Sequence, residues 1–188
     1  MEQTHLAAIK IFAIEKQNTA TQALWVIMFA ALTAVGAQIE IPHQPVPYTL
    51  QTFFVLLAGA FLGKEKGAAS QLAYLGFGAL GVPVFAGFGF GVARLLGPTG
   101  GYLLSFPVAA FAVGYLLPRN KSFLWSLVSM IVGLFIIFSL GTVQLNLMYV
   151  HNWAQAISNG FLIFSWWDAV KLFAAASIYH QASKHRVA

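Results

Sequence analysis

The 188-residue chain contains no cysteine and very little charge. The absence of cysteine excludes a disulfide framework and a cysteine-ligated metal site. Charged residues make up only 8% of the sequence, whereas soluble domains carry about a quarter. Hydrophobic residues make up 59%, and the mean hydropathy is +0.76. This composition excludes an ordinary water-soluble domain and indicates an integral membrane protein.

Uninterrupted apolar runs distinguish helical spans from the strands of a membrane barrel. Residues 53–62 are apolar throughout, whereas barrel strands alternate apolar and polar residues. We therefore expect an all-α membrane protein that forms one domain over residues 1–188 with six transmembrane helices. The expected spans are residues 20–39, 50–63, 67–81, 99–117, 122–149 and 166–180.

The ends of the chain and its basic residues predict the topology. Residues 1–18 interleave charged and apolar side chains without a small-residue cleavage site, which indicates an interfacial amphipathic helix rather than a cleavable signal. If both termini are cytoplasmic, the outer loops hold a single basic residue, Arg94, as the positive-inside rule expects. The basic residues on the cytoplasmic side are then Lys10, Lys16, Lys64, Lys66, Arg119, Lys121, Lys184 and Arg186. In this setting, the net charge of +5 marks cytoplasmic loops and does not point to nucleic acid.

One segment, residues 82–102, differs from the spans around it. It contains six glycines, two prolines and four aromatic residues, with Arg94 as its one charge. Glycine and proline at this density disfavour a helix interior. We expect a long ordered loop that covers a binding site, on the same outer face as the proline-rich turn 40–49 and the connector 150–165.

The last span carries two ionisable residues, Asp168 and Lys171. They are three residues apart and therefore share one helix face. Each ion at the membrane centre costs about 2.5–3.5 kcal/mol, so the pair should face a polar cavity and bind a ligand there. The alternative is that they neutralise each other near the interface, beside Trp166 and Trp167.

Two features of residues 82–102 suit an anion. The guanidinium of Arg94 can bind two oxygens of a carboxylate or phosphate, although an interfacial arginine that reaches lipid headgroups is the alternative. Backbone N–H groups around Gly100, at the start of a span, form a second favourable place for an anion, unless the segment is only a tight turn. Neither a phosphate-binding P-loop nor a dinucleotide fingerprint is present.

The chain offers little for catalysis. Its five acidic residues are scattered, and only Asp168 lies within a span. The histidines have no metal-ligand spacing on a shared helix face; they are His5, His43, His151, His180 and His185. We therefore expect neither an enzyme nor a bound metal.

Several motifs occur in an order that resembles the BioY family, the biotin-binding S components of energy-coupling factor (ECF) transporters. The motifs are residues 47–52 (PYTLQT), 55–59 with Gly63, 81–87 (GVPVFAG), 96–102 (LGPTGGY) and 167–171 (WDAVK). The resemblance extends from about the first span to the last. It implies a six-helix protein of the bacterial cytoplasmic membrane that captures biotin from the outer face.

The resemblance also implies partners. Such subunits work with a transmembrane coupling protein and a pair of ATPases, which use the ATP, so the chain itself needs no cofactor. The first span carries a stripe of small residues, Ala30, Ala34 and Ala37, that matches the place where these subunits meet the coupling protein. Packing of the stripe inside the protein is the alternative.

With biotin as ligand, the candidate residues acquire roles. Asp168 would accept from a ureido N–H and Lys171 would donate to the ureido oxygen, with Tyr74 as a further polar contact. Arg94 or the backbone around Gly100 would hold the carboxylate. The side chains expected to cover the apolar part are Phe85, Phe88, Phe90 and Trp167.

Three other interpretations of the sequence stay open. One is an S component for a different small vitamin-like molecule. Another is a membrane-embedded enzyme that modifies lipids, with Asp168 and His151 as its polar pair. The third is a structural membrane subunit, which would have no use for buried charges.

Overall fold

The computed structural model describes residues 18–117, 122–162 and 166–184. The interfacial helix expected over residues 1–18 lies outside this range except for Asn18. Asn18 is the N-cap of the first described helix, because its side-chain oxygen accepts a hydrogen bond of 2.8 Å from the Thr21 N–H.

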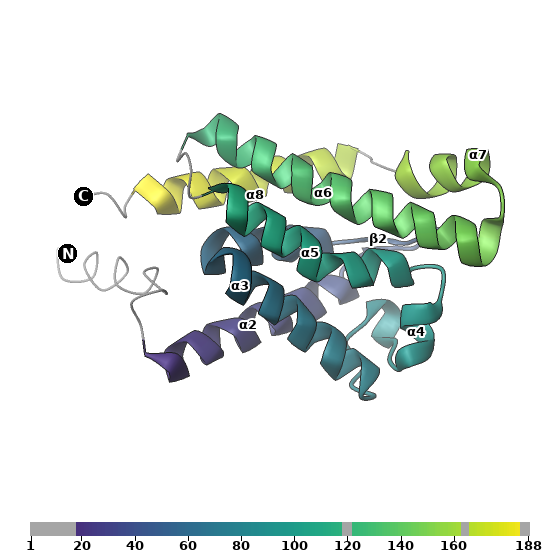
Figure 1. Ribbon diagram of the computed structural model, residues 1–188, viewed down its shortest axis with the longest axis horizontal. Helices are drawn as coiled ribbons and strands as arrows, with labels where there is room; N and C mark the ends of the chain where they lie inside the picture. The colour runs from purple at the N-terminus through teal and green to yellow at the C-terminus, as the bar shows by residue number, and fades with distance from the viewer. Residues whose placement is uncertain (1–17, 118–121, 163–165, 185–188) are drawn as a thin grey trace.

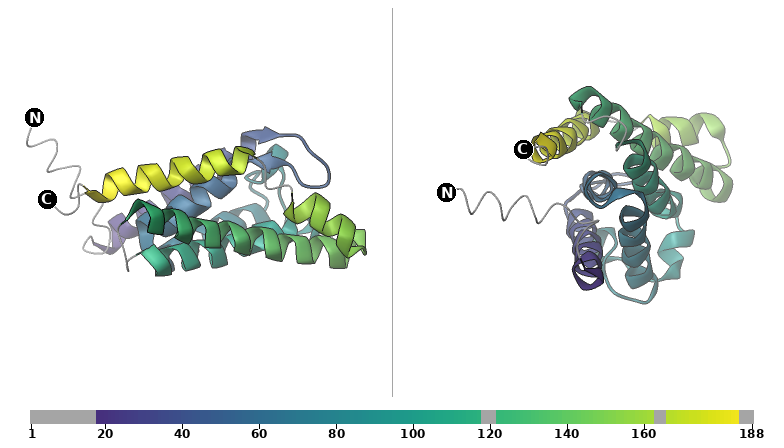
Figure 2. Two further views of the ribbon diagram at one scale, coloured as in Figure 1. Left: turned by 90° about the horizontal axis from the view of Figure 1, so that it is seen from above. Right: turned by 60° about the vertical axis from the view of Figure 1, so that its left-hand side comes forward.

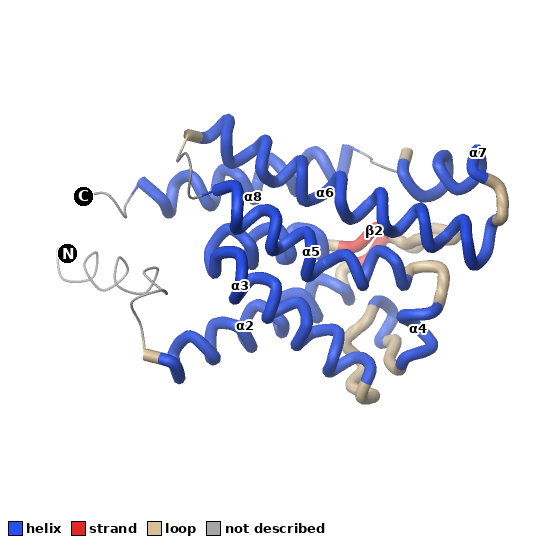
Figure 3. The backbone as a smooth tube through the Cα atoms, viewed as in Figure 1, coloured by secondary structure: helices blue, strands red, loops and turns tan. Residues whose placement is uncertain are grey.

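The described chain is helical apart from one two-stranded ribbon, which confirms the expected all-α class (Figures 1 and 3). The α-helices and strands are α2 (Thr19–Gln38), β1 (Glu40–Ile41), β2 (Tyr48–Thr49), α3 (Gln51–Ala79), α4 (Val92–Leu96), α5 (Gly100–Leu116), α6 (Phe123–Leu145), α7 (Trp153–Ala156) and α8 (Trp166–Lys184). Single 3₁₀ or π turns follow at η2 (Ala86–Phe88), η4 (Asn146–Val150) and η5 (Ile157–Phe161). Most predicted spans agree with these helices to within a few residues.

Helix α3 is in fact two antiparallel arms joined at Gly63, which has φ +78° and ψ 179°. The Gln51 Nε2 donates a 2.6 Å hydrogen bond to the Tyr74 hydroxyl, although a straight helix would separate these residues by about 35 Å. Gly59 and Gly67 also approach closely, since a Cβ on Gly67 would lie 2.8 Å from the Gly59 Cα. The two short spans expected over residues 50–63 and 67–81 correspond to the two arms of this helical hairpin.

Two described helical segments are long and apolar enough to cross a membrane by themselves, namely 19–38 and 123–150. A bent pair, 153–161 with 166–184, adds a third candidate. The other predicted crossings correspond to the arms of α3 and to α5, a shorter apolar helix.

The bundle is built around the α3 hairpin. Helix α3 contacts α2 on one side and α5 on the other, α5 contacts α6, and α8 contacts α6 and α3 (Figure 2). Small residues bring α3 and α5 together, because a Cβ on Gly114 would overlap the Gly63–Lys64 backbone and one on Gly59 would overlap the Ala110 carbonyl.

The small-residue stripe of α2 packs inside the protein. Ala30 and Ala37 are 3% and 0% exposed, and Ala34 is half-buried. A Cβ on Gly36, on the same face, would lie 3.1 Å from the Leu50 backbone. Internal packing therefore accounts for Ala30 and Ala37, whereas a contact of the stripe with a coupling protein through the partly exposed Ala34 stays a prediction.

The ribbon, α4 and α7 lie at one end of the bundle, and the start of α2 and the end of α8 lie at the other (Figure 1). The three segments expected to share the outer face are thus together. The cytoplasmic location of the termini remains a prediction.

Residues 82–102 are not a loop throughout, because η2 and α4 form within them. Gly91, with φ +86°, begins the turn of α4 and Gly97 ends it, so the glycines limit this helix rather than prevent it.

Candidate functional site

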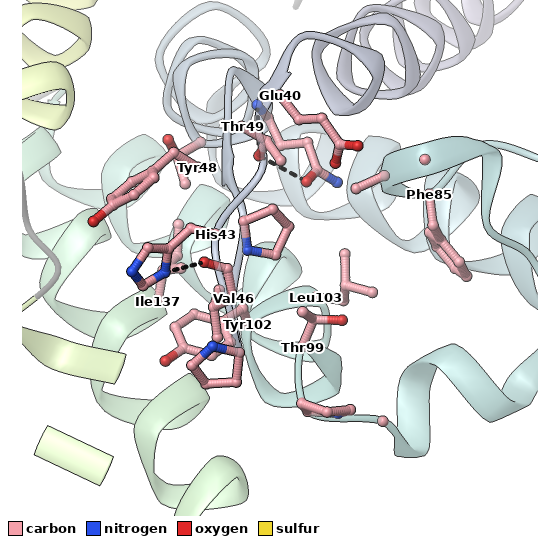
Figure 4. A pocket seen from close by; sticks show the side chains of 18 of the residues that line it. Glu40, His43, Val46, Tyr48, Thr49, Phe85, Thr99, Tyr102, Leu103 and Ile137 are labelled. Carbon is pink, nitrogen blue, oxygen red and sulfur yellow. Dashed lines mark hydrogen bonds between the residues drawn. The ribbon is translucent and has the colours of Figure 1, made fainter. Parts of the chain in front are cut away.

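A cavity of about 380 Å³ opens at the ribbon end of the bundle. Its walls come from the ribbon, the start of α3, residues 85–99, α5, α6 and α8, and Figure 4 shows the side chains that surround it. Among the lining residues, Asp168 and Lys171 are buried, whereas His43 and Arg94 are exposed to solvent. The cavity therefore has a charged base inside the bundle and a polar rim, and its size suits a small ligand.

The base of the cavity is an ion pair. The Lys171 Nζ lies 2.7 Å from the Asp168 Oδ1, and the two side chains are 5% and 4% exposed. The same ammonium donates to the Thr49 carbonyl at 2.9 Å and to the Thr52 hydroxyl at 2.8 Å. These contacts tie α8 to the ribbon and to the start of α3. The predicted placement of the pair on one face, toward a cavity, is confirmed.

The wall beside the base is apolar and aromatic. Phe85 is 2% exposed and lines the cavity; its ring sits over Gly78 and meets the Tyr74 ring edge-on at 5.5 Å. Further apolar lining residues from α5 and α6 are Leu103, Phe106, Ile137 and Phe138. Such a surface suits an apolar ring system.

The remaining aromatic residues predicted to cover a ligand do not line the cavity. Phe88 and Phe90 are 68% and 59% exposed, because the chain turns back at Gly87 and Phe88, both at positive φ. Trp167 is half-buried and lies outside the lining. The prediction for these three residues is wrong.

Tyr74, a predicted ligand contact, lies behind the cavity wall. Its hydroxyl accepts from the Gln51 Nε2 at 2.6 Å and donates to the Val84 carbonyl at 3.2 Å, and the residue is 1% exposed. Gln51 lines the cavity in its place. Tyr74 therefore supports the site and does not form part of its surface.

Both predicted anion-binding features reach the cavity, the second through Gly97, Pro98 and Thr99, which precede Gly100 in the chain. Arg94, on α4, is exposed at the rim, and its guanidinium covers Gly89. Gly100 is buried outside the lining, and its N–H donates to the Gly97 carbonyl at 2.9 Å. A Cβ at Gly100 would overlap the Leu95 carbonyl oxygen. Gly100 itself is thus a glycine for close packing, and an anion contact from the backbone around it stays a prediction.

The proline-rich turn supplies lining residues that the sequence did not single out. His43 and Tyr48 lie with ring centres 5.1 Å apart, and the His43 Nδ1 is 3.2 Å from the Val46 carbonyl oxygen (Figure 4). Glu40 and Thr49 line the cavity from the two strands. The three prolines of this turn are compatible with a stiff cap over a pocket and equally with a mere connector, and nothing in their spacing indicates which neighbours face inward.

Comparison with known proteins identifies the family. The family model described as "BioY family" matches residues 8–187. The chain belongs to the BioY family. The motif-based resemblance is therefore confirmed, and with it a transporter rather than an enzyme.

Individual BioY relatives are similar over most of their length. The chain is 48% identical to the biotin transporter BioY of Thermotoga maritima over 85% of this chain and 94% of that one. It is 47% identical to the probable biotin transporter BioY of Pyrococcus horikoshii, with 81% and 90% covered.

A solved BioY-type structure has the same fold. It is the crystal structure of an S-component for biotin from an ECF-type ABC transporter, which matches with a TM-score of 0.79 and 25% identity over 88% of this chain and 92% of that one. The predicted S-component architecture, a multi-pass helical membrane protein, is confirmed.

Proposed function

We propose that this chain is the substrate-binding component of an ECF transporter in the bacterial cytoplasmic membrane and that it binds biotin in the cavity. The observation that carries the proposal is the buried pair of Asp168 and Lys171 at the cavity base in a member of the BioY family. The ureido ring of biotin carries two N–H donors and one carbonyl acceptor, which such a pair can match.

The positions of the polar and apolar groups in the cavity determine the orientation of the bound ligand. The ureido ring lies at the base, where Asp168 accepts from a ureido N–H. Because the hydrogens of Lys171 already reach Asp168, Thr49 and Thr52, this lysine donates to the ureido oxygen only by giving up one of these contacts. The thioether ring packs on Phe85, and the carboxylate extends to Arg94 at the rim.

The proposed partners are a transmembrane coupling protein and an ATPase pair, as in other ECF transporters. Since Ala30 and Ala37 are buried, a partner that contacts α2 meets mostly the opposite, exposed face of that helix. The residues of this face are Leu24, Ile27, Ala31 and Val35.

The structure does not support the alternative of a lipid-modifying enzyme, because its two expected polar residues lie apart. His151 is exposed and lies outside the cavity lining, whereas Asp168 is buried against Lys171. The two side chains proposed as its polar pair therefore do not share a pocket.

A competition experiment tests the ligand. Purified, detergent-solubilised chain is equilibrated with radiolabelled biotin, and unlabelled biotin, riboflavin, thiamine and other vitamins compete for binding. The proposal predicts saturable binding that only biotin and close analogues displace. Displacement by an unrelated vitamin at lower concentration would assign the chain to a different substrate.

A further inference from the structure

Residues 84–97, the covering segment, line one side of the cavity, and a glutamine from a different helix holds each end of this segment. Residues 84–97 carry Phe85 near one end and Arg94 near the other. Gln38 ends α2, and Gln144 lies near the end of α6. Neither glutamine lines the cavity, yet both bind the backbone of this covering segment.

Gln38 holds the loop that presents Phe85. Its Nε2 donates to the Phe85 carbonyl at 3.1 Å, and its Oε1 accepts from the Phe88 N–H at 3.0 Å. The loop is closed by two further bonds between Phe85 and Gly89, at 3.0 and 3.1 Å. One amide therefore bridges the two sides of a five-residue loop, and this fixes where the Phe85 ring enters the wall.

Gln144 holds the other end, where α4 carries Arg94. Its Nε2 donates to the Leu95 carbonyl at 3.0 Å and to the Gly97 carbonyl at 3.2 Å. The Leu95 carbonyl lies at the end of α4, where carbonyls lack partners within the helix, so Gln144 supplies its partner. The Gly97 carbonyl also accepts from the Gly100 N–H at 2.9 Å. The Tyr149 hydroxyl binds the Leu96 carbonyl at 2.9 Å.

The glycines of the LGPTGGY motif make room for this contact. A Cβ on Gly101 would lie 2.7 Å from the Gln144 Cβ, and one on Gly100 would overlap the Gln144 amide. The start of α5 can thus pack directly on α6, and this packing places the amide beneath the end of α4.

We propose that Gln38 and Gln144 are positioning residues that act on different parts of one ligand. Gln38 sets Phe85 against the apolar rings, and Gln144 sets Arg94 toward the carboxylate. This inference rests on the proposed function, in which the cavity binds biotin. Because the two amides come from separate helices and bind opposite ends of the segment, we expect them to affect the ligand differently.

The affinities of the full-length variants for two ligands test whether Gln38 and Gln144 act on different parts of the ligand. Gln38→Met and Gln144→Met remove the donors with little change in length, and biotin is compared with biotin amide, which has no carboxylate. Loss of two hydrogen bonds corresponds to about a tenfold change in affinity. Gln144→Met should weaken biotin about tenfold and leave biotin amide nearly unchanged. Gln38→Met should weaken both ligands by the same factor.

A double variant asks whether Gln144 acts through Arg94. If it does, Gln144→Met added to Arg94→Ala should weaken biotin no further than Arg94→Ala alone. Melting temperatures identify variants that fold poorly, and Gln144→Leu replaces the methionine variant in that case. For Gln144, a merely structural role would lower the melting temperature and weaken both ligands equally. For Gln38, which should weaken both ligands equally in either case, a merely structural role is shown by weakening that occurs only together with a lower melting temperature.

The possible outcomes distinguish a failure of the positioning role from a failure of the proposed biotin binding. Equal weakening of both ligands by Gln144→Met, or no weakening of biotin, overturns the positioning role while biotin binding stands. If the unchanged chain binds neither ligand, the proposed function fails, and the ligand roles of both glutamines fail with it.

Discussion

Lys171 and Asp168 form an ion pair of 2.7 Å that is almost completely buried and lies at the base of a cavity. An unpaired charge in this position would be costly, whereas a paired one leaves a carboxylate beside the ligand space. The ribbon and the start of α3 contribute Thr49 and Thr52 to the same ammonium. The site is therefore assembled from three parts of the chain.

Replacement of Asp168 by Asn should weaken biotin by about 10- to 100-fold, because a charge-assisted hydrogen bond to the ureido ring is lost. The same change leaves Lys171 without its carboxylate and should lower the melting temperature. Isothermal titration and thermal unfolding in detergent measure the two effects. Unchanged affinity would remove Asp168 from the ligand site.

The double variant Asp168→Asn with Lys171→Met separates binding from stability. Replacement of both members of a buried pair is far less destabilising than removal of one, since no buried charge is left unpaired. We expect the melting temperature of the double variant to be higher than that of Asp168→Asn and closer to that of the unchanged chain, while biotin affinity stays low. Recovery of binding together with stability would mean that the pair has only a structural role.

Phe85 and Phe88 provide a matched comparison within one loop. Phe85→Ala removes a buried ring from the cavity wall, and we expect at least tenfold weaker biotin binding as about 2 kcal/mol or more of apolar contact is lost. Phe88→Ala removes a side chain that is 68% exposed and should leave affinity within about twofold. Equal effects of the two changes on titration would contradict the assigned orientations.

Gly100 should tolerate no side chain. Gly100→Ala would drive a methyl group into the Leu95 carbonyl and the Gln144 amide, and overpacking of this kind costs about 1–3 kcal/mol. Gly76→Ala is the control, because a Cβ there meets nothing within 4 Å and alanine is the better helix former. Thermal unfolding should show a lower midpoint for Gly100→Ala and an equal or higher one for Gly76→Ala.

Tyr74→Phe tests the revised role of this residue. The change removes a hydroxyl that binds Gln51 and Val84, and leaves a buried amide N–H without its partner at a cost of about 1–3 kcal/mol. We expect a lower melting temperature and a change in biotin affinity of less than about fivefold. A loss as large as that of Asp168→Asn would instead place the tyrosine in contact with the ligand.

The sequence was sufficient for features that depend on local pattern. Apolar runs located the spans, and the three-residue spacing of Asp168 and Lys171 placed both on one face. The break between the spans 50–63 and 67–81 followed from the charged residues between two apolar segments, and the structure places the bend at Gly63. In each case, the physical cause lies within a few residues of the feature.

Features that depend on distant contacts were not predictable from the pattern. Tyr74 was predicted as a polar contact to the ligand, and only the hairpin brings its hydroxyl to Gln51, which it supports. The stripe with Ala30 and Ala37 fits any close helix contact, so its spacing could not tell an internal partner from an external one. Within residues 85–90, the positive φ of Phe88 decides which rings face outward.

Determination of the structure with biotin bound tests the central claim most directly. The account predicts that the ureido ring lies within hydrogen-bonding distance of Asp168 at the cavity base, with the thioether ring on Phe85 and the carboxylate toward Arg94. A ligand with its carboxylate at the base, or one bound outside this cavity, would contradict it.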